Sequence, residues 1–299
     1  MSILLPGAAV ALLTLVAVVL LASPTRVRDE HNAALLAARR HEDHTALASL
    51  LGVVAAVVLL VSGTSGPLLH LDPPGLLGAL SLTAGAVIFL AIHYVGQYTW
   101  PRPVGHIRQA SLRRRSIRQL AGRRAVLLLA TAAVLTCALA IFGLTADDSG
   151  RAVPHLITSE AAAQGSLGGA SGPYPGWPYA LPLLGAFAVV LLATFLVLRL
   201  VARRPAVAGT RDADDHALRL TSARRVLGGA QLFLGGTGAA VLLLATVSLN
   251  SAGWWLAALI TGPLGLAIGL GSVLLAATAL PPTATTPTGT TPDRADAAR

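Results

Sequence analysis

Long apolar segments without charged residues alternate with short polar segments along this chain. A helix rises about 1.5 Å per residue, so about 20 apolar residues are needed to cross roughly 30 Å of hydrocarbon. Seven segments approach or exceed this length: 3–22, 45–62, 76–97, 125–145, 179–198, 226–249 and 254–280. Helices satisfy their own backbone hydrogen bonds in lipid. The pattern therefore predicts an all-α polytopic membrane protein, with a bundle of seven transmembrane helices over residues 1–280.

The composition excludes a water-soluble globular protein. An ordinary soluble domain has about 25% charged residues, whereas 12% of these 299 residues are charged and 54% are hydrophobic. The one cysteine, Cys137, excludes an internal disulfide and a cysteine-clustered metal site. Cys137 falls within a predicted span, where we expect it to be buried.

The arginines predict the orientation of the bundle. The chain has no lysine, and its 22 basic residues are all arginine. If seven helices alternate in direction, every arginine except Arg151 falls on one side. Basic loops stay on the cytoplasmic side, so we expect the amino terminus outside and the carboxyl terminus in the cytoplasm, in the plasma membrane. Residues 281–299, rich in Pro and Thr, are expected to form a disordered cytoplasmic tail.

This arginine-rich face predicts anionic phospholipids as partners and explains the high isoelectric point without nucleic acid. Small residues recur at four-residue spacing, at Gly235/Ala239, Gly236/Ala240 and Gly265/Gly269, and let helices approach closely. We expect most of this packing to be internal, although one such face could bind a membrane-protein partner or a second copy of the chain.

The aromatic residues support the predicted helix ends. Tryptophan and tyrosine favour the membrane interface, and all of them lie at or just beyond a predicted helix end: Tyr94, Tyr98, Trp100, Tyr174, Trp177, Tyr179, Trp254 and Trp255. We therefore expect an interfacial aromatic belt. The Trp-Pro-Arg-Pro stretch that begins at Trp100 is expected to form a stiff turn with an interfacial anchor.

His93 and Gln97 form a candidate polar site within the membrane. His93 is the only histidine inside a predicted span, and it shares a helical face with Phe89, Gln97 and Trp100. An intramembrane ionisable residue is a functional candidate, but near the helix end an interfacial hydrogen-bonding role is favoured. No second buried histidine is predicted that would complete a bis-histidine haem site, and no cofactor is expected.

A second candidate site lies in the loops predicted to be outside. Imidazole and carboxylate groups together suit a divalent cation such as zinc. The candidate ligands are His70, Asp72, Asp147, Asp148 and His155, with Glu160 nearby in sequence. The alternative is a set of ordinary solvated loop residues.

Two polar patterns adjoin the predicted spans. His41 and His44, separated by two acidic residues, could form a metal-binding or proton-sensing cluster, but a solvated polar lead-in to span 45–62 is favoured. Arginine pairs precede three spans, at Arg39-Arg40, Arg123-Arg124 and Arg224-Arg225. They could mark a repeated unit, but arginines that extend to the membrane interface are favoured, because the motif is short and topology alone produces it.

No catalytic residue is predicted. The sequence has no phosphate-binding glycine loop with its lysine, no HExxH motif and no GxSxG elbow. Coupled transporters usually carry midplane charges and interrupted helices, and here only Pro263 interrupts a span, where we expect a kink. We therefore predict a non-enzymatic accessory, assembly or sensory component. The alternatives are a small-solute transporter or channel and, with only His93 in its favour, an intramembrane enzyme or redox protein.

Three stretches carry a family resemblance. They are Tyr-Thr-Trp-Pro-Arg-Pro at residues 98–103, Ala-Ser-Gly-Pro-Tyr-Pro-Gly at 170–176, and Asp-Asp-His-Ala-Leu at 214–218, which leads into Arg224-Arg225. With these stretches the chain resembles uncharacterised multi-pass membrane proteins of high-GC actinobacteria. The resemblance covers most of the chain, and it implies a membrane location but no activity.

Reporter fusions test the predicted topology. We expect fusions after Arg40, Arg124, Arg225 and Arg299 to report the cytoplasm, because positive loops are retained there. A fusion within residues 163–172 should report the exterior, measured with paired reporters that are active on one side only. A cytoplasmic signal from that fusion would overturn the predicted orientation.

Overall fold

The computed structural model describes residues 33–63, 75–100, 116–156, 168–207 and 212–279. These ranges hold six long helices and one pair of two-residue strands. The elements are α2 (Ala33–Gly63), α3 (Leu76–Tyr98), α4 (Ile117–Thr145), β1 (Val153–Pro154), β2 (Ala170–Ser171), α6 (Trp177–Arg203), α7 (Asp212–Ser251) and α8 (Trp255–Ala277). All six helices are long and apolar enough to cross a membrane. The chain is thus an all-α, multi-pass membrane protein; the predicted span 3–22 and tail 281–299 lie outside the described residues.

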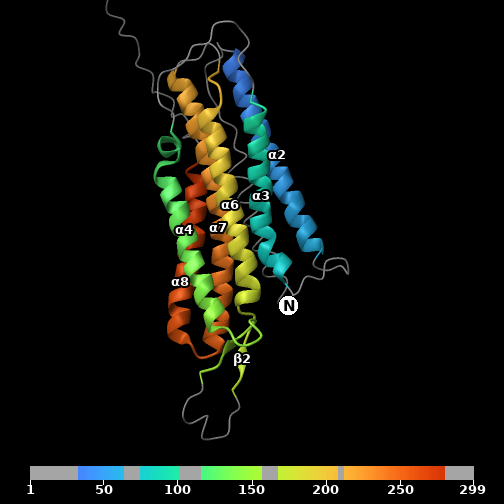
Figure 1. Cartoon of the computed structure of the whole chain (residues 1–299), viewed down its shortest axis with the longest axis vertical. Coiled ribbons are helices and arrows are strands. Elements are labelled where there is room, and N and C mark those ends of the chain that lie inside the picture. Colours follow the sequence, from blue (N-terminus) through green and yellow to red (C-terminus); the bar gives the residue numbers. More distant parts are fainter. Residues whose placement is uncertain (1–32, 64–74, 101–115, 157–167, 208–211, 280–299) are drawn as a thin grey trace, which may run out of the picture.

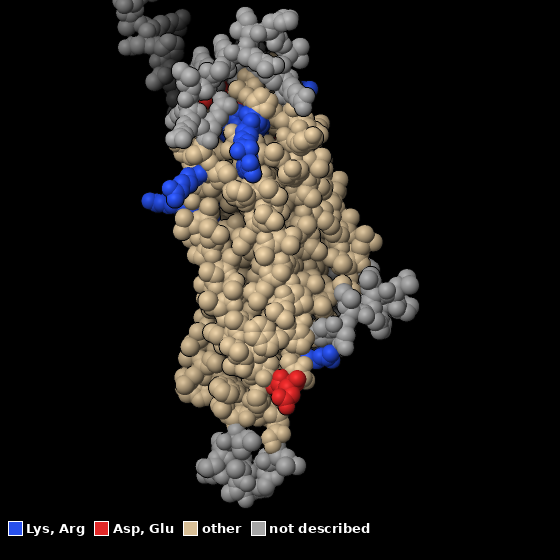
Figure 2. Space-filling model, viewed as in Figure 1, with Lys and Arg blue, Asp and Glu red and all other residues tan. Residues whose placement is uncertain are grey.

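The helices run side by side along one long axis and alternate in direction (Figure 1). Helices α2, α4 and α7 begin at the end where α3, α6 and α8 finish, which we call the basic end. Strands β1 and β2 lie at the opposite end, which we call the hairpin end. Figure 2 shows charged side chains near the two ends of the visible face and an uncharged band between them, as the hydrocarbon layer requires.

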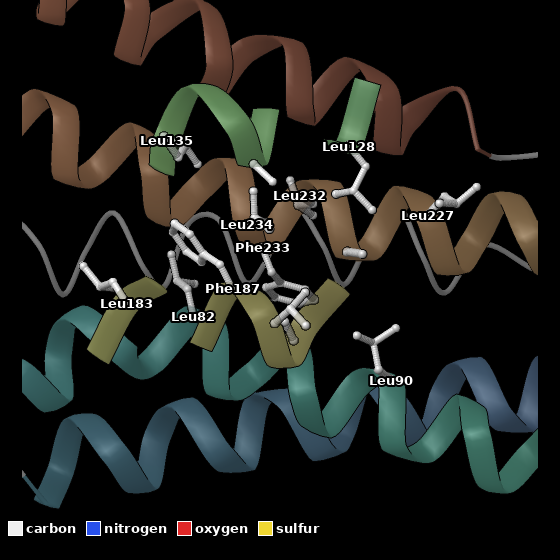
Figure 3. Close-up of a cluster of buried hydrophobic side chains, with 14 of the residues drawn as sticks. Leu82, Leu90, Leu128, Leu135, Leu183, Phe187, Leu227, Leu232, Phe233 and Leu234 are labelled. Carbon is white, nitrogen blue, oxygen red and sulfur yellow. The ribbon is translucent and has the colours of Figure 1, made fainter. Parts of the chain in front are cut away.

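Helix α7 is the centre of the bundle. In its most apolar window 72% of the residues are buried, compared with 22% for α8. Helices α3, α4, α6 and α8 all pack against α7, whereas α2 packs mainly on α3. Figure 3 shows leucine and phenylalanine side chains from α3, α4 and α6 converging on the α7 residues Leu227, Leu232, Phe233 and Leu234.

Three helices begin earlier than the hydrophobic pattern predicted. Helix α2 begins at Ala33 instead of 45, α4 at Ile117 instead of 125, and α7 at Asp212 instead of 226. The prediction counted only apolar residues, but polar residues continue a helix where it extends beyond the hydrocarbon. Three acidic side chains in the first turn of α7 also interact favourably with the positive end of the helix dipole.

The backbone conformation at Gly122 and Pro263 fits the residue types at these positions. Helix α4 has a non-helical conformation at Gly122, with φ 48° and ψ −140°, a region that favours glycine. Helix α8 continues through Pro263, so the predicted span is not broken there. Helix α2 likewise continues through the polar residues that precede position 45, of which Glu42 is buried and His44 is exposed, so the predicted lead-in is helical and only partly solvated.

Small residues bring α7 and α8 together. A Cβ atom added at Gly265 would lie 3.1 Å from the Cβ of Leu242, and one added at Gly269 would lie 3.2 Å from the Cβ of Ala239. A Cβ at Gly235 would overlap the Oγ of Ser272. Gly235, Ala239, Gly265 and Gly269 are among the small residues that the sequence singled out, and in the described bundle they serve packing within one chain.

Two predictions about single side chains are wrong. Cys137 is exposed on the surface of α4 and not buried, because α4 contributes only one face to the bundle. Tyr174 does not belong to an interfacial belt, since it is 2% exposed and its hydroxyl lies 2.7 Å from the Oγ1 of Thr145. Burial raises the pKa of Tyr174, and the hydrogen bond to Thr145 opposes that rise.

Paired glycine substitutions test the α7–α8 contact. We expect Gly235→Ala to lower the free energy of unfolding by about 1–3 kcal/mol, because the added methyl group must displace Ser272. Gly271→Ala is the control, since nothing lies within 4 Å of the added group on α8. It should be neutral or stabilise by up to about 1 kcal/mol through helix propensity. Equal melting temperatures for both variants in detergent would contradict the close approach.

Candidate functional site

A group of polar and charged side chains is buried at the basic end, where the sequence predicted solvated loops and helix ends. Each member is at most 5% exposed. The members, which we call the basic-end cluster, are Glu42 on α2, His93 and Gln97 on α3, Trp100, Arg204, and Asp215, Arg219, Ser222 and Arg225 on α7. Buried charged groups are costly unless they are paired and hydrogen-bonded, so the contacts of this cluster decide what it can do.

Arg219 binds the carboxyl-terminal end of α6. Its Nε donates to the Oδ2 of Asp215 at 2.8 Å, one turn away on α7. Its Nη1 donates to the carbonyl oxygen of Val201 at 2.7 Å, and its Nη2 to that of Arg204 at 2.8 Å. The last carbonyl groups of a helix lack partners within the helix and carry its negative dipole end. One guanidinium therefore caps α6 and joins it to α7.

Arg204 connects the end of α6 to α2, α3 and α7. Its Nη1 donates to the Oε1 of Gln97 at 3.1 Å and to the Oγ of Ser222 at 3.2 Å. The same Nη1 lies 3.7 Å from the Oε2 of Glu42, and the guanidinium carbon is 3.8 Å from the centre of the Trp100 ring. This places a cation on an aromatic face. Trp100 is therefore a buried partner of Arg204, which corrects the prediction of an interfacial anchor.

Burial lowers the pKa of Arg204 to about 10, while the nearby carboxylate of Glu42 opposes the change. The side chain is still charged at neutral pH. Its Nε and Nη2 atoms are buried and have no hydrogen-bond partner among the residues that the structure describes. The charge is stabilised mainly by the carboxylate of Glu42, by the ring of Trp100 and by the two hydrogen bonds that Nη1 donates.

One member of each of two arginine pairs turns inward. The Nη2 of Arg225 donates to the Oδ1 of Asp43 at 3.1 Å and joins α7 to α2. Arg124 donates from Nη1 to the carbonyl oxygen of Leu275 at 2.8 Å and from Nη2 to that of Thr278 at 2.7 Å, so it caps α8. The neighbouring Arg123 and Arg224 are exposed. The sequence favoured arginines that extend outward to the membrane interface. In these two pairs that interpretation fits only the exposed members, Arg123 and Arg224.

The residues that the sequence places on one face of α3 lie inside the bundle. Phe89, His93, Gln97 and Trp100 are all buried. The Nδ1 of His93 donates to the carbonyl oxygen of Phe89 at 3.1 Å, and the two rings are 4.3 Å apart. His93 thus makes a hydrogen bond within its own helix and is buried inside the bundle, and its place at the depth of the membrane interface stays a prediction.

The histidines before span 45–62 do not form a joint site. The Nε2 of His41 donates to the carbonyl oxygen of Gly96 at 2.8 Å, which joins α2 to α3, whereas His44 is exposed. Among the described residues, no group of three or more His, Cys, Asp or Glu side chains is arranged to hold a metal ion. In this arrangement His41 is a contact between helices.

Of the candidate zinc ligands, Asp147, Asp148 and His155 are described, while His70, Asp72 and the neighbouring Glu160 lie outside the described residues. The Oδ1 of Asp147 accepts from the Oγ of Ser149 at 2.7 Å and from two backbone N–H groups. Partial burial acts to raise the pKa of Asp147, but these hydrogen bonds outweigh it and lower the pKa. The Nε2 of His155 lies 2.8 Å from the Oγ of Ser171. Asp147 stabilises its own turn, and zinc binding stays a prediction.

A second buried polar contact lies deep in the bundle. The Nε2 of Gln231 on α7 donates to the Oγ1 of Thr131 on α4 at 3.0 Å and to the Oγ of Ser272 on α8 at 2.9 Å. Its Oε1 is buried without a hydrogen-bond partner among the described residues. Gln231 is the only glutamine in span 226–249. A lone amide side chain within an apolar span is the sequence signal for this contact.

The cavity between α4, α6 and α7 is apolar and leaves no room for a water molecule. It is lined by Leu135, Ala138, Leu139, Phe142, Phe187, Gly238, Val241 and Leu242. The described centre of the bundle is therefore closely packed.

Comparison of the whole chain with protein-family models, with curated proteins and with solved structures found no match. Function is therefore argued from the geometry of the basic-end cluster and the bundle interior.

Substitutions of two α7 aspartates test the ion pair in the basic-end cluster. We expect Asp215→Asn to lower the free energy of unfolding by about 3 kcal/mol, because Arg219 then stays buried without its carboxylate. Asp212→Asn removes the same charge from an exposed position in the same turn, and we expect a change below about 0.5 kcal/mol. Thermal unfolding of both variants in one detergent measures the difference. Equal losses would assign the effect to the charge of the first helical turn.

Proposed function

We propose that this protein is a non-enzymatic component of the plasma membrane, of the accessory, assembly or sensory class. The observation that carries the proposal is the use of its buried polar groups. Arg219, Arg204 and Gln231 each bind groups on neighbouring helices. In an enzyme or a transporter we would expect such groups to converge on a space that a substrate can enter.

The packing of α7 supports the same proposal. Its central position and its small residues bring α8 to within contact of the α7 backbone, as at Gly265, where an added Cβ would lie 3.3 Å from the carbonyl oxygen of Ala239. The adjoining cavity is apolar. A helix held this closely on several sides is suited to a rigid assembly platform more than to alternating access.

The proposal includes the orientation and partners of the protein. A seven-helix arrangement with the amino terminus outside and the carboxyl terminus in the cytoplasm places the basic end at the anionic cytoplasmic leaflet. Exposed arginines at that end, such as Arg118, Arg123 and Arg203, support anionic phospholipids as partners. A membrane-protein partner or a second copy of the chain is also proposed, and nucleic acid is not.

A small-solute transporter or channel is the alternative, and one observation favours it. The Oε1 of Gln231 is buried within the membrane-spanning part of α7 without a hydrogen-bond partner among the described residues. Transporters place such groups near the midplane, but usually beside interrupted helices, whereas α7 is continuous through Gln231. An intramembrane enzyme or redox protein is the second alternative, and it rests on His93 alone.

Cysteine accessibility separates the proposal from the transport alternative. In a Cys137→Ser background we expect Ser272→Cys, beside Gln231, to resist a membrane-impermeant maleimide, because Ser272 is 1% exposed within a packed contact. Asp148→Cys and Asp212→Cys are exposed controls at opposite ends of the bundle. The first should be labelled in intact cells and the second only after the membrane is opened.

Labelling of Ser272→Cys as fast as either exposed control would contradict a packed accessory protein and favour a water-filled pathway. Labelling of Asp212→Cys in intact cells would overturn the proposed orientation and leave the packing argument unaffected.

A further inference from the structure

An open pocket of about 490 Å³ lies at the basic end, between the start of α4 and the end of α6. Arg118 from α4 and Arg199 and Arg203 from α6 line it, together with the apolar side chains of Ile117 and Phe195. The volume falls within the range of small-molecule sites. The pocket is separate from the basic-end cluster, whose side chains are buried between helices.

The α6 side of this pocket changes from polar to apolar with depth. Phe195, Arg199 and Arg203 are four residues apart, so they lie on one face of the helix, each step about 6 Å along its axis. Arg203 is at the helix end, Arg199 lies one turn deeper, and Phe195 a further turn toward the hydrocarbon. The pocket thus presents two levels of positive charge above an aromatic ring.

The three arginines of the pocket make no polar contact that holds the described part of the fold together. All three are exposed, and none has a hydrogen bond or an ion pair with another residue in the part of the chain that the structure describes. The inward arginines at the same end differ in this respect, since Arg124 caps α8 and Arg204 binds Gln97. Three positive charges around one pocket repel each other, which an anion would relieve.

We propose that this pocket binds the phosphate head group of an anionic phospholipid. Guanidinium groups bind phosphate oxygens in a bidentate manner. The apolar floor continues into exposed leucines of α6, Leu192 and Leu196, along which acyl chains can lie. A free phosphate ion has the same head-group chemistry but gains nothing from Phe195. The inference rests on the orientation and lipid partners of the proposed function, and it assigns them a site.

Native mass spectrometry of the delipidated full-length protein tests the site by titration with phosphatidylglycerol and phosphatidylcholine. We expect the wild type to bind phosphatidylglycerol more tightly. The double variant Arg199→Gln/Arg203→Gln should bind it about 30-fold more weakly, with phosphatidylcholine binding unchanged. The control Arg40→Gln/Arg224→Gln removes the same charge from exposed positions at the same end, outside the pocket, and should change the affinity less than about 3-fold.

Each other outcome overturns a defined part of the inference. Equal wild-type affinity for the two lipids would overturn both the site and the lipid partners of the proposed function. Equal weakening in the two double variants would overturn the site alone and assign the preference to diffuse surface charge. Displacement of phosphatidylglycerol by inorganic phosphate at the same concentration would identify a free-anion site. If the pocket variant fails to fold, Arg118→Gln provides the same comparison from α4.

Discussion

The guanidinium of Arg219 lies between the carboxylate of Asp215 and the open carbonyl groups that end α6, and the basic end of the bundle depends on this contact. A helix that ends near lipid leaves carbonyl groups that water reaches poorly, and each unsatisfied group there is costly. Arg219 satisfies them from α7. The end of α6 is thereby positioned, and with it Arg204, which in turn reaches Gln97 on α3.

The same requirement explains why polar residues deep in the bundle act as links between helices. Hydrophobic burial does not drive helices together within lipid, so packing of small residues and hydrogen bonds between helices provide the association. Gln231 links α7 to α4 and α8 in one contact, and Gly235 allows Ser272 to approach closely enough to take part. The basic-end cluster and the Gln231 contact thus both join helices through hydrogen bonds, at two different depths of the bundle.

Arginine has three different roles at the basic end. Arg219 and Arg225 are buried and bind groups within the bundle, Arg124 caps a neighbouring helix, and Arg199 and Arg203 point outward around an open pocket. The positive-inside pattern treats these residues alike because it counts charge along the chain. Which of them remain available to a lipid or a partner depends on the contacts that each one makes.

Sequence alone determined the all-α class, the apolar segments of the six helices that the structure describes and the shared face of α3 that carries Phe89, His93 and Gln97, because the hydrophobic pattern and helical periodicity are local properties. It did not reveal that α2 and α7 extend through polar residues, that Trp100 is buried under Arg204, or that Cys137 faces outward. Only the tertiary structure decided these points. Arg204 and Gln97 lie 107 positions apart in the chain, and their pairing depends on how the helices pack, which no local pattern encodes.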